Sequence, residues 1–95
     1  MKGYQKNRLF VARKIKDQGF LVPVSEDIHE MRSVYKLNDL GWFVWQNLDK
    51  KGDLESLVSL ISGKYVLDRA TASGDLKIFL ENLIRAGALL LEERN

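Results

Sequence analysis

The stretch that decides the fold covers residues 34–48 and reads VYKLNDLGWFVWQNL. Apolar and polar residues alternate up to Leu37, as in a strand, whereas from Leu40 onward the apolar residues recur at helical spacing. Asn38 stands at the junction, where its side chain can accept hydrogen bonds from the open N–H groups of the first turn. Asp39 adds a negative charge at the positive end of the helix. The stretch therefore predicts a strand that leads directly into a capped helix.

Both tryptophans of the chain, Trp42 and Trp45, fall within this helix but outside its main apolar stripe. A helix that is apolar on most of its circumference is usually buried on more than one side. We therefore expect a central helix, with a small sheet on one side and later helices on the other. Gly41 in its first turn is about 1 kcal/mol less favourable than alanine. Close approach of another backbone and simple tolerance near a helix start explain this glycine equally well.

The residues before this stretch alternate in character and predict a small antiparallel sheet. Its strands are expected over residues 9–15, 20–24 and 32–37. We expect a tight turn at residues 17–19, because Gly19 accepts the positive φ that such hairpins need. The residues expected to share a face are Leu9, Val11 and Ile15 in the first strand, Phe20, Val22 and Val24 in the second, and Tyr35 and Leu37 in the third.

The residues after this stretch predict two further helices. The central helix is expected over residues 39–48. Asp53 is expected to cap the second helix and Gly63 to end it, while Ser73 caps the third helix and Gly87 stops it. The expected core face of the third helix consists of Leu76, Phe79, Leu80, Leu83 and Ile84. The other expected segments are a flexible terminus over residues 1–7, a connector over residues 64–72 and a short final strand or tail over residues 88–91.

The predicted order is βββααα within one domain over residues 1–95. This is an α+β fold of winged-helix-like build, with a three-stranded antiparallel sheet followed by a three-helix bundle. A chain of 95 residues with 45% hydrophobic residues is large and apolar enough to bury one core.

The sequence lacks the groups that catalysis and metal binding require. It contains no cysteine, so disulfides, thiolate ligands and thiol nucleophiles are excluded. The single histidine, His29, lies in a polar stretch over residues 25–30, where a solvated loop is favoured over a metal site. No serine has a histidine in a plausible partner position, and no glycine pattern matches a phosphate-binding loop. We expect a protein that is not an enzyme and that uses no cofactor and no metal.

Charge and hydropathy limit the classes of partner that the protein can bind. The net charge is +2, but residues 1–16 contain six basic residues and no acidic one. This basic segment can contact nucleic acid or an acidic peptide, although a solvated edge strand is the simpler interpretation. No apolar run approaches the ~20 residues of a membrane span, and no signal peptide is visible. We therefore expect a cytoplasmic protein without a membrane partner.

A set of apolar and capping residues, in a fixed order, resembles a known family. Its members are Leu37, Asn38, Trp45, Leu48, Asp49, Leu57, Val58, Tyr65, Asp75, Leu76, Phe79, Leu80, Leu83 and Gly87. Together they resemble the PqqD-like proteins of pyrroloquinoline quinone (PQQ) biosynthesis. More broadly they resemble the recognition element of ribosomally made, post-translationally modified peptides (RiPPs). The resemblance covers residues 8–91. One departure is that the family usually has Asp-Gly directly after the first helix, whereas here Lys50 and Lys51 intervene.

The resemblance implies a non-catalytic peptide chaperone. Proteins of this family bind the leader of a precursor peptide and present it to a modifying enzyme, such as a radical-SAM maturase or a cyclase–protease pair. The leader adds as a strand to the edge of the third strand and lies against the third helix. The residues expected to bind it are Arg32, Ser33, Val34, Tyr35, Lys36, Leu37, Ile78, Glu81, Asn82 and Arg85. On the third helix, Ile78 is expected to point away from the core, among charged residues.

Two other functions remain open from the sequence. Three helices beside a sheet are also the build of a winged-helix DNA-binding protein, whose third helix enters the major groove. Here the third helix carries Asp75, Lys77, Glu81 and Arg85, which sum to zero, and a neutral helix is a poor phosphate binder. A gel shift with mixed DNA at low salt separates this function from peptide binding. The second alternative is a structural subunit of a larger enzyme complex.

Overall fold

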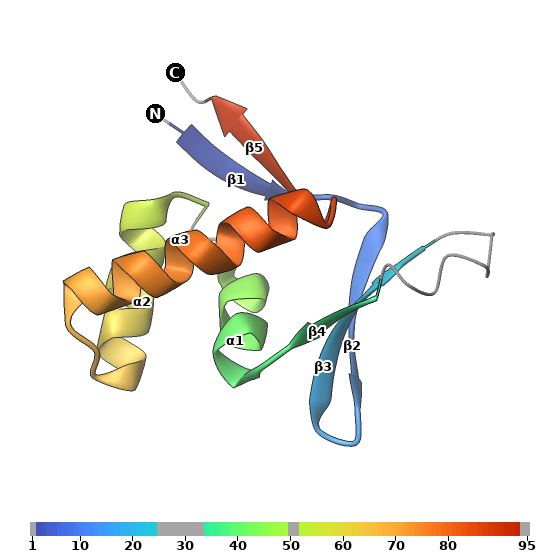
Figure 1. Cartoon of the computed structure of the whole chain (residues 1–95), viewed down its shortest axis with the longest axis horizontal. Helices are drawn as coiled ribbons and strands as arrows, with labels where there is room; N and C mark the ends of the chain where they lie inside the picture. Colours follow the sequence, from blue (N-terminus) through green and yellow to red (C-terminus); the bar gives the residue numbers. More distant parts are fainter. Residues whose placement is uncertain (1, 25–33, 50–51, 94–95) are drawn as a thin grey trace.

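The computed structural model describes residues 2–24, 34–49 and 52–93. Along this part of the chain the elements are β1 (Lys2–Lys6), β2 (Phe10–Ile15), β3 (Gln18–Pro23), β4 (Tyr35–Leu37), α1 (Asp39–Asn47), α2 (Leu54–Tyr65), α3 (Arg69–Arg85) and β5 (Leu89–Glu93) (Figure 1). The predicted α+β class, with three strands preceding three helices, is confirmed. A second small sheet, formed by β1 and β5, is added to it. Residues 25–30 with His29 lie outside the described residues.

The larger sheet has the order β2-β3-β4, and both of its pairings are antiparallel. β2 and β3 are joined by a two-residue turn at Lys16 and Asp17, whose φ angles are 51° and 69°. Two consecutive positive φ angles are those of a type I′ turn, which suits the twist of a hairpin. The turn predicted at residues 17–19 was therefore wrong in position and length, and Gly19 lies inside β3 instead.

The register decides which face of this sheet is buried. Leu21 and Leu37 are buried on the inner face. Tyr35 shares that face with Leu37, as predicted, because side chains two residues apart point the same way. Val11 and Val22 oppose each other on the outer face, and Val11 is exposed. The predicted groupings in the first two strands therefore face outward, because alternation gives the two faces but not which one meets the core.

A strand lies within residues 1–7, where we expected a flexible terminus. Lys2–Lys6 form β1, which pairs antiparallel with β5 from Lys2 opposite Glu93 to Lys6 opposite Leu89. The N–H of Tyr4 also donates to the carbonyl of Gly52 at 2.7 Å. Strand pairing between the two ends of the chain thus orders the polar N-terminal residues and gives the final strand its partner (Figure 1).

Helix caps were predicted correctly at two of three N-termini. The N–H of Gly41 donates to Asn38 Oδ1 at 2.7 Å, and the N–H of Ser56 donates to Asp53 Oδ1 at 2.6 Å. The third helix begins five residues earlier than expected: Asp68, not Ser73, is its cap.

Two helix ends were also predicted, and one was wrong. α2 continues through the expected stop at Gly63 and ends at Tyr65, where Val66 adopts a left-handed φ of 53°. α3 ends just before Gly87, whose φ of 83° is the left-handed conformation that glycine favours.

The core lies where the three helices meet the inner face of the larger sheet. Trp45 on α1 is 3% exposed and belongs to one buried cluster with residues of α2, α3 and the sheet. The buried side chains of the helices are Val44, Trp45, Leu57, Val58, Ile61, Ala72, Leu76, Leu80 and Leu83. The prediction that α1 is the central helix is confirmed. Trp42, half-buried on the same helix, packs against Gly19 of β3.

Candidate functional site

β4 is an edge strand. It pairs with β3 on one side, and no strand of the described ranges pairs with its other side. An unpaired edge offers free N–H and C=O groups to an incoming strand. The short strand β4 is therefore the first candidate for a binding surface.

The hairpin geometry shows which backbone groups face this open edge. A two-residue type I′ loop closes on a hydrogen-bonded pair, here Ile15 and Gln18, and the pairs then alternate along the strands. The backbone groups of Gln18 and Phe20 consequently point toward β2, and those of Gly19 point toward β4. Lys36, opposite Phe20, lies in a non-hydrogen-bonded pair with β3. Its N–H and C=O therefore point outward to the open edge.

A side-chain contact supports the same assignment. Gln18 Nε2 donates to the carbonyl oxygens of Gly19 at 3.1 Å and Leu37 at 2.5 Å. Both oxygens lie within reach of one amide nitrogen, as expected if both point into the space between β3 and β4. Leu37 is therefore turned toward β3, and Lys36, the residue before it, is turned away.

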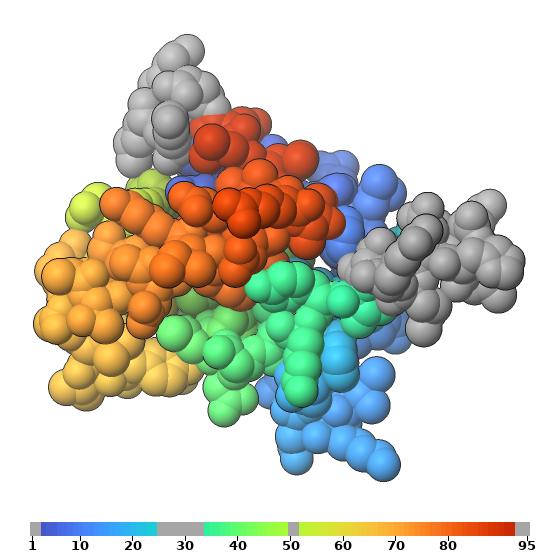
Figure 2. Space-filling model, in the orientation of Figure 1, coloured from blue at the N-terminus to red at the C-terminus, as the bar shows by residue number. Residues whose placement is uncertain are grey.

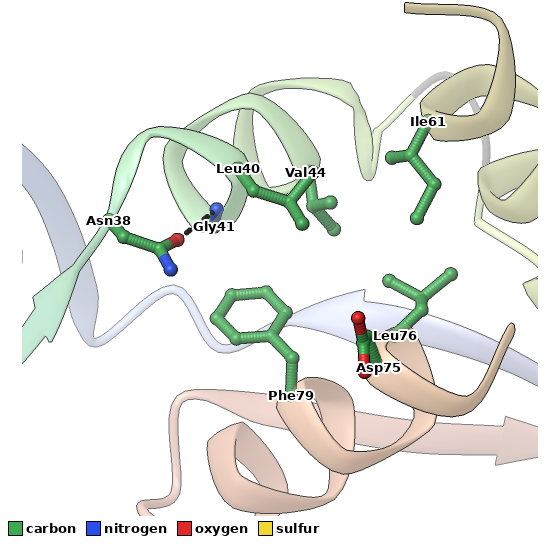
Figure 3. A pocket seen from close by; sticks show the side chains of 8 residues that line it. All are labelled: Asn38, Leu40, Gly41, Val44, Ile61, Asp75, Leu76 and Phe79. Carbon is green, nitrogen blue, oxygen red and sulfur yellow. Dashed lines mark hydrogen bonds between the residues drawn. The ribbon is translucent and has the colours of Figure 1, made fainter. Parts of the chain in front are cut away.

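A cavity opens between α1 and α3, close to this edge. Its volume is about 210 Å³, and six of its eight lining residues are apolar or glycine (Figure 3). The lining residues are Asn38, Leu40, Gly41, Val44, Ile61, Asp75, Leu76 and Phe79. The ring of Phe79 lies opposite the start of α1 in this view. Such a cavity suits an apolar side chain, with one amide and one carboxylate present to fix orientation.

A second cavity, of about 230 Å³, lies next to the first and includes residues of β4 in its lining. It is lined by Tyr35, Lys36, Asn38 and Phe79, so Asn38 and Phe79 border both cavities. We call the two together the β4–α3 groove. In the space-filling view, β4 and the start of α1 lie directly beside α3 at the surface (Figure 2). An extended peptide along β4 would therefore meet α3 as well.

Close packing between α1 and α3 explains the glycine in the first turn of α1. A Cβ on Gly41 would lie 3.0 Å from the ring of Phe79 and 3.2 Å from Asn38 Oδ1. The close approach that we considered at Gly41 does exist, but its partner is a side chain rather than a backbone. The glycine lets Phe79 reach α1 and so shapes the groove.

Only some of the residues predicted to bind the peptide line the groove. Tyr35 and Lys36 line the groove, Leu37 is buried beneath it, and Val34 is half-buried just before β4. Arg32 and Ser33 lie outside the described residues. On α3, helical spacing puts Asn82 one turn from Phe79, and Ile78, which is 61% exposed, one turn from Asp75. The groove is lined from α3 by Asp75, Leu76 and Phe79.

Glu81 and Arg85 are exposed and do not line the groove. The pKa of Tyr4 on β1 is raised, first by burial of the hydroxyl and then by the negative charge of Glu81. Glu81 therefore lies on the flank of α3 that faces β1, away from β4. Sequence reasoning treated Phe79 as a core residue only. The unfavourable position of Gly41 was the signal that could have shown its proximity to α1.

The described ranges hold no cluster of three His, Cys, Asp or Glu residues that could bind a metal ion. The outer face of α3 mixes Lys77, Glu81 and Arg85, and at its start Arg69 is paired with Glu55 at 2.9 Å. Over residues 2–24, 34–49 and 52–93, no helix is long and apolar enough to cross a membrane.

Comparison with known proteins shows the family of the chain and a similar solved structure. The chain is similar to the solved structure of TbiB1 in complex with the TbiA(beta) leader peptide, with a TM-score of 0.72 and 25% sequence identity. The alignment covers 90% of this chain and 93% of that one. No curated protein sequence matches the chain. A family model described as coenzyme PQQ synthesis protein D (PqqD) matches residues 27–89, which is more than half of the sequence. The resemblance seen in the sequence is thereby confirmed: the chain belongs to the PqqD family.

Proposed function

We propose that this protein binds the leader segment of a precursor peptide by adding it as a strand to the open edge of β4. The observation that carries the proposal is the outward-facing backbone of Lys36 beside a groove that reaches α3. The similarity to TbiB1, which was solved in complex with a leader peptide, supports a leader peptide as the ligand. Membership of the PqqD family supports a role in peptide modification.

The backbone contacts alone are too weak to hold a peptide. Each ladder hydrogen bond contributes about 0.5–1.5 kcal/mol net, and β4 is only three residues long. Full burial of one Val, Leu or Phe side chain adds about 1.5–3 kcal/mol. The cavity behind Phe79 has room for such a side chain. Backbone pairing therefore sets the register of the peptide, and the groove supplies most of its affinity.

The protein would act by presentation rather than by catalysis. The bound leader holds the precursor while a separate modifying enzyme, such as a radical-SAM maturase or a cyclase–protease pair, acts on the remainder of the peptide. The site that we describe contains no nucleophile–base pair and needs no cofactor for this task. We place this activity in the cytoplasm, where ribosomally made precursors are produced.

Titration with a leader peptide tests the proposal directly. The probe is the leader of a short precursor encoded beside the gene for this protein, added to the isotope-labelled chain and followed by NMR. We expect amide shifts at residues 34–38 and 74–82. Shifts confined to α2, or no binding at all, would contradict strand addition at β4.

A pair of proline variants makes the test sharper. Lys36→Pro removes an edge N–H that is not used in pairing with β3, so the fold should persist while peptide affinity falls by about two- to tenfold. Lys14→Pro is the matched control, because its N–H faces the open edge of β2 by the same alternation. If Lys14→Pro and Lys36→Pro weaken binding equally, the peptide does not pair with β4.

A further inference from the structure

The outer face of the larger sheet carries three side chains in one row. Arg13 on β2 is directly opposite Phe20 on β3, and Phe20 is directly opposite Lys36 on β4. Directly opposed residues project from the same face, with Cβ atoms about 4.5–5.5 Å apart. An aromatic side chain thus lies between two cations, and Lys36 ends the row at the open edge.

Neither cation of this row has an ionic partner among the described residues. Some basic side chains elsewhere are engaged: Lys6 bonds to Asp49 at 3.1 Å, and Lys14 and Lys64 lie over aromatic rings. Arg13 and Lys36 are both exposed, and no described strand residue on this face is acidic. The two acidic residues nearest to the row in sequence are Asp17, in the hairpin turn, and Asp39, the first residue of α1. Within the described residues, the edge at Lys36 therefore presents a positive charge that has no ionic partner.

A peptide added to β4 must place one residue beside Lys36 on this same face. This holds for antiparallel and for parallel addition, because side chains of neighbouring strands stay in register across the sheet. The two peptide residues that flank it point to the other face, toward Tyr35 and Phe79 in the groove. Three consecutive side chains of the peptide would therefore contact the protein, the middle one beside Lys36 and the two others in the groove.

We propose that the protein selects leader peptides that carry Asp or Glu beside Lys36, flanked on both sides by apolar residues that enter the groove. This inference rests on the proposed strand addition and specifies its substrate. Opposite charges across a ladder are favourable and like charges are unfavourable. Because the pair is exposed, a single match should change the dissociation constant only about two- to fivefold, and salt should weaken the preference.

The experiment uses peptides that the protein itself selects, so the natural leader need not be identified. A random peptide display library is panned against the immobilised protein. The register of a selected peptide is then fixed from NMR contacts to Lys36. Three versions of this peptide, with Glu, Gln or Lys at the position beside Lys36, are titrated against the wild type, Lys36→Glu and Lys77→Glu. Lys77 is exposed on α3, about opposite Phe79 on the helix, so it controls for net charge alone.

We expect the wild type to prefer the peptides in the order Glu, Gln, Lys, with about a tenfold difference between the first and the last. Lys36→Glu should invert this order, Lys77→Glu should keep it, and high salt should reduce it. Equal affinities for the three peptides, or an inversion in Lys77→Glu as well, would overturn the inference. In either case, amide shifts at residues 35–37 would leave the proposed function standing. Bound peptides that shift no residue of β4 would overturn both.

Discussion

The indole of Trp42 packs directly on the backbone of Gly19. A Cβ atom added at Gly19 would lie only 2.7 Å from Trp42 Cε3. This contact joins the middle strand of the sheet to α1. The ammonium of Lys14 lies over the same ring, at 4.9 Å from its centroid. Gly19 lies inside β3 and not in the hairpin turn. The position therefore requires glycine because Trp42 fills the space of a side chain, and not because of a turn conformation.

Gly19→Ala should destabilise the protein, because the new methyl group cannot fit without moving Trp42. Such overpacking typically lowers the free energy of unfolding by about 1–3 kcal/mol. Chemical denaturation measures it. The control is Gly74→Ala in α3, where an added Cβ meets no atom within 4 Å. That change should stabilise the helix by about 1 kcal/mol. Equal effects of the two substitutions would show that Trp42 does not pack on Gly19.

Alanine substitutions of Trp45 and Phe79 should differ in their effects on stability and on peptide binding. Trp45 is 3% exposed, and Trp45→Ala should lower the free energy of unfolding by about 3–5 kcal/mol, a large part of the ~5–10 kcal/mol of a domain this small. Phe79 is only half-buried, so Phe79→Ala should destabilise less while abolishing peptide binding in the groove. Thermal melts and peptide titrations of both variants test this. Full peptide affinity in a folded Phe79→Ala variant would contradict the groove.

Asp68 should stabilise the start of α3 in a pH-dependent way. Hydrogen bonds from the N–H and the hydroxyl of Thr71 lower the pKa of the Asp68 carboxyl. A lowered pKa in the folded state means that the stabilisation is present at neutral pH and is lost as the pH falls through that pKa. Asp68→Ala should therefore lower the Tm at pH 7 and change it less near pH 3. Ser73→Ala, inside α3, is the control and should leave the Tm nearly unchanged. A larger decrease in Tm from Ser73→Ala than from Asp68→Ala would show that Ser73 caps the helix, as predicted from the sequence.

Val66→Gly should stabilise the protein. Val66 follows α2 with a φ of 53° and is 90% exposed, so its side chain gains little from burial. A left-handed conformation is unfavourable by roughly 1–2 kcal/mol for a residue with a Cβ, and the flexibility of glycine in the unfolded chain offsets part of the relief. We expect a net gain of about 0.5–1 kcal/mol in chemical denaturation. Val66→Ala retains the Cβ and should not reproduce this gain.

Local signals in the sequence were sufficient for the strand–helix junction and two of the caps. Asn38 and Asp53 stand directly before strongly periodic apolar residues, so the first turn of each helix could be placed. At α3 the same reasoning failed because Arg69 to Ser73 contain no large apolar residue. The first turn of that helix is therefore without periodicity, and the true cap at Asp68 could not be distinguished from Ser73.

The remaining differences depend on contacts between residues that are distant in sequence. Alternation in β2 could not show that Ala12, rather than Val11, lies on the inner face, because the choice depends on the pairing of β3 with β4. The groove was predicted only in outline. Phe79 could be placed on the inner face of its helix, but its contact with Gly41, which brings it to the edge of β4, is a tertiary contact that no local pattern encodes.

The pairing of β1 with β5 has a consequence for how the molecule folds. Bringing Lys2 beside Glu93 closes a loop that contains almost the whole chain, and the entropy of that closure must be lost before any of its hydrogen bonds form. The hairpin of β2 and β3 needs only a two-residue turn, and each helix forms from local contacts. We therefore expect the sheet of the two termini to form last and to open first. Local unfolding would then begin at the ends of the chain, with β4 and α3 still assembled.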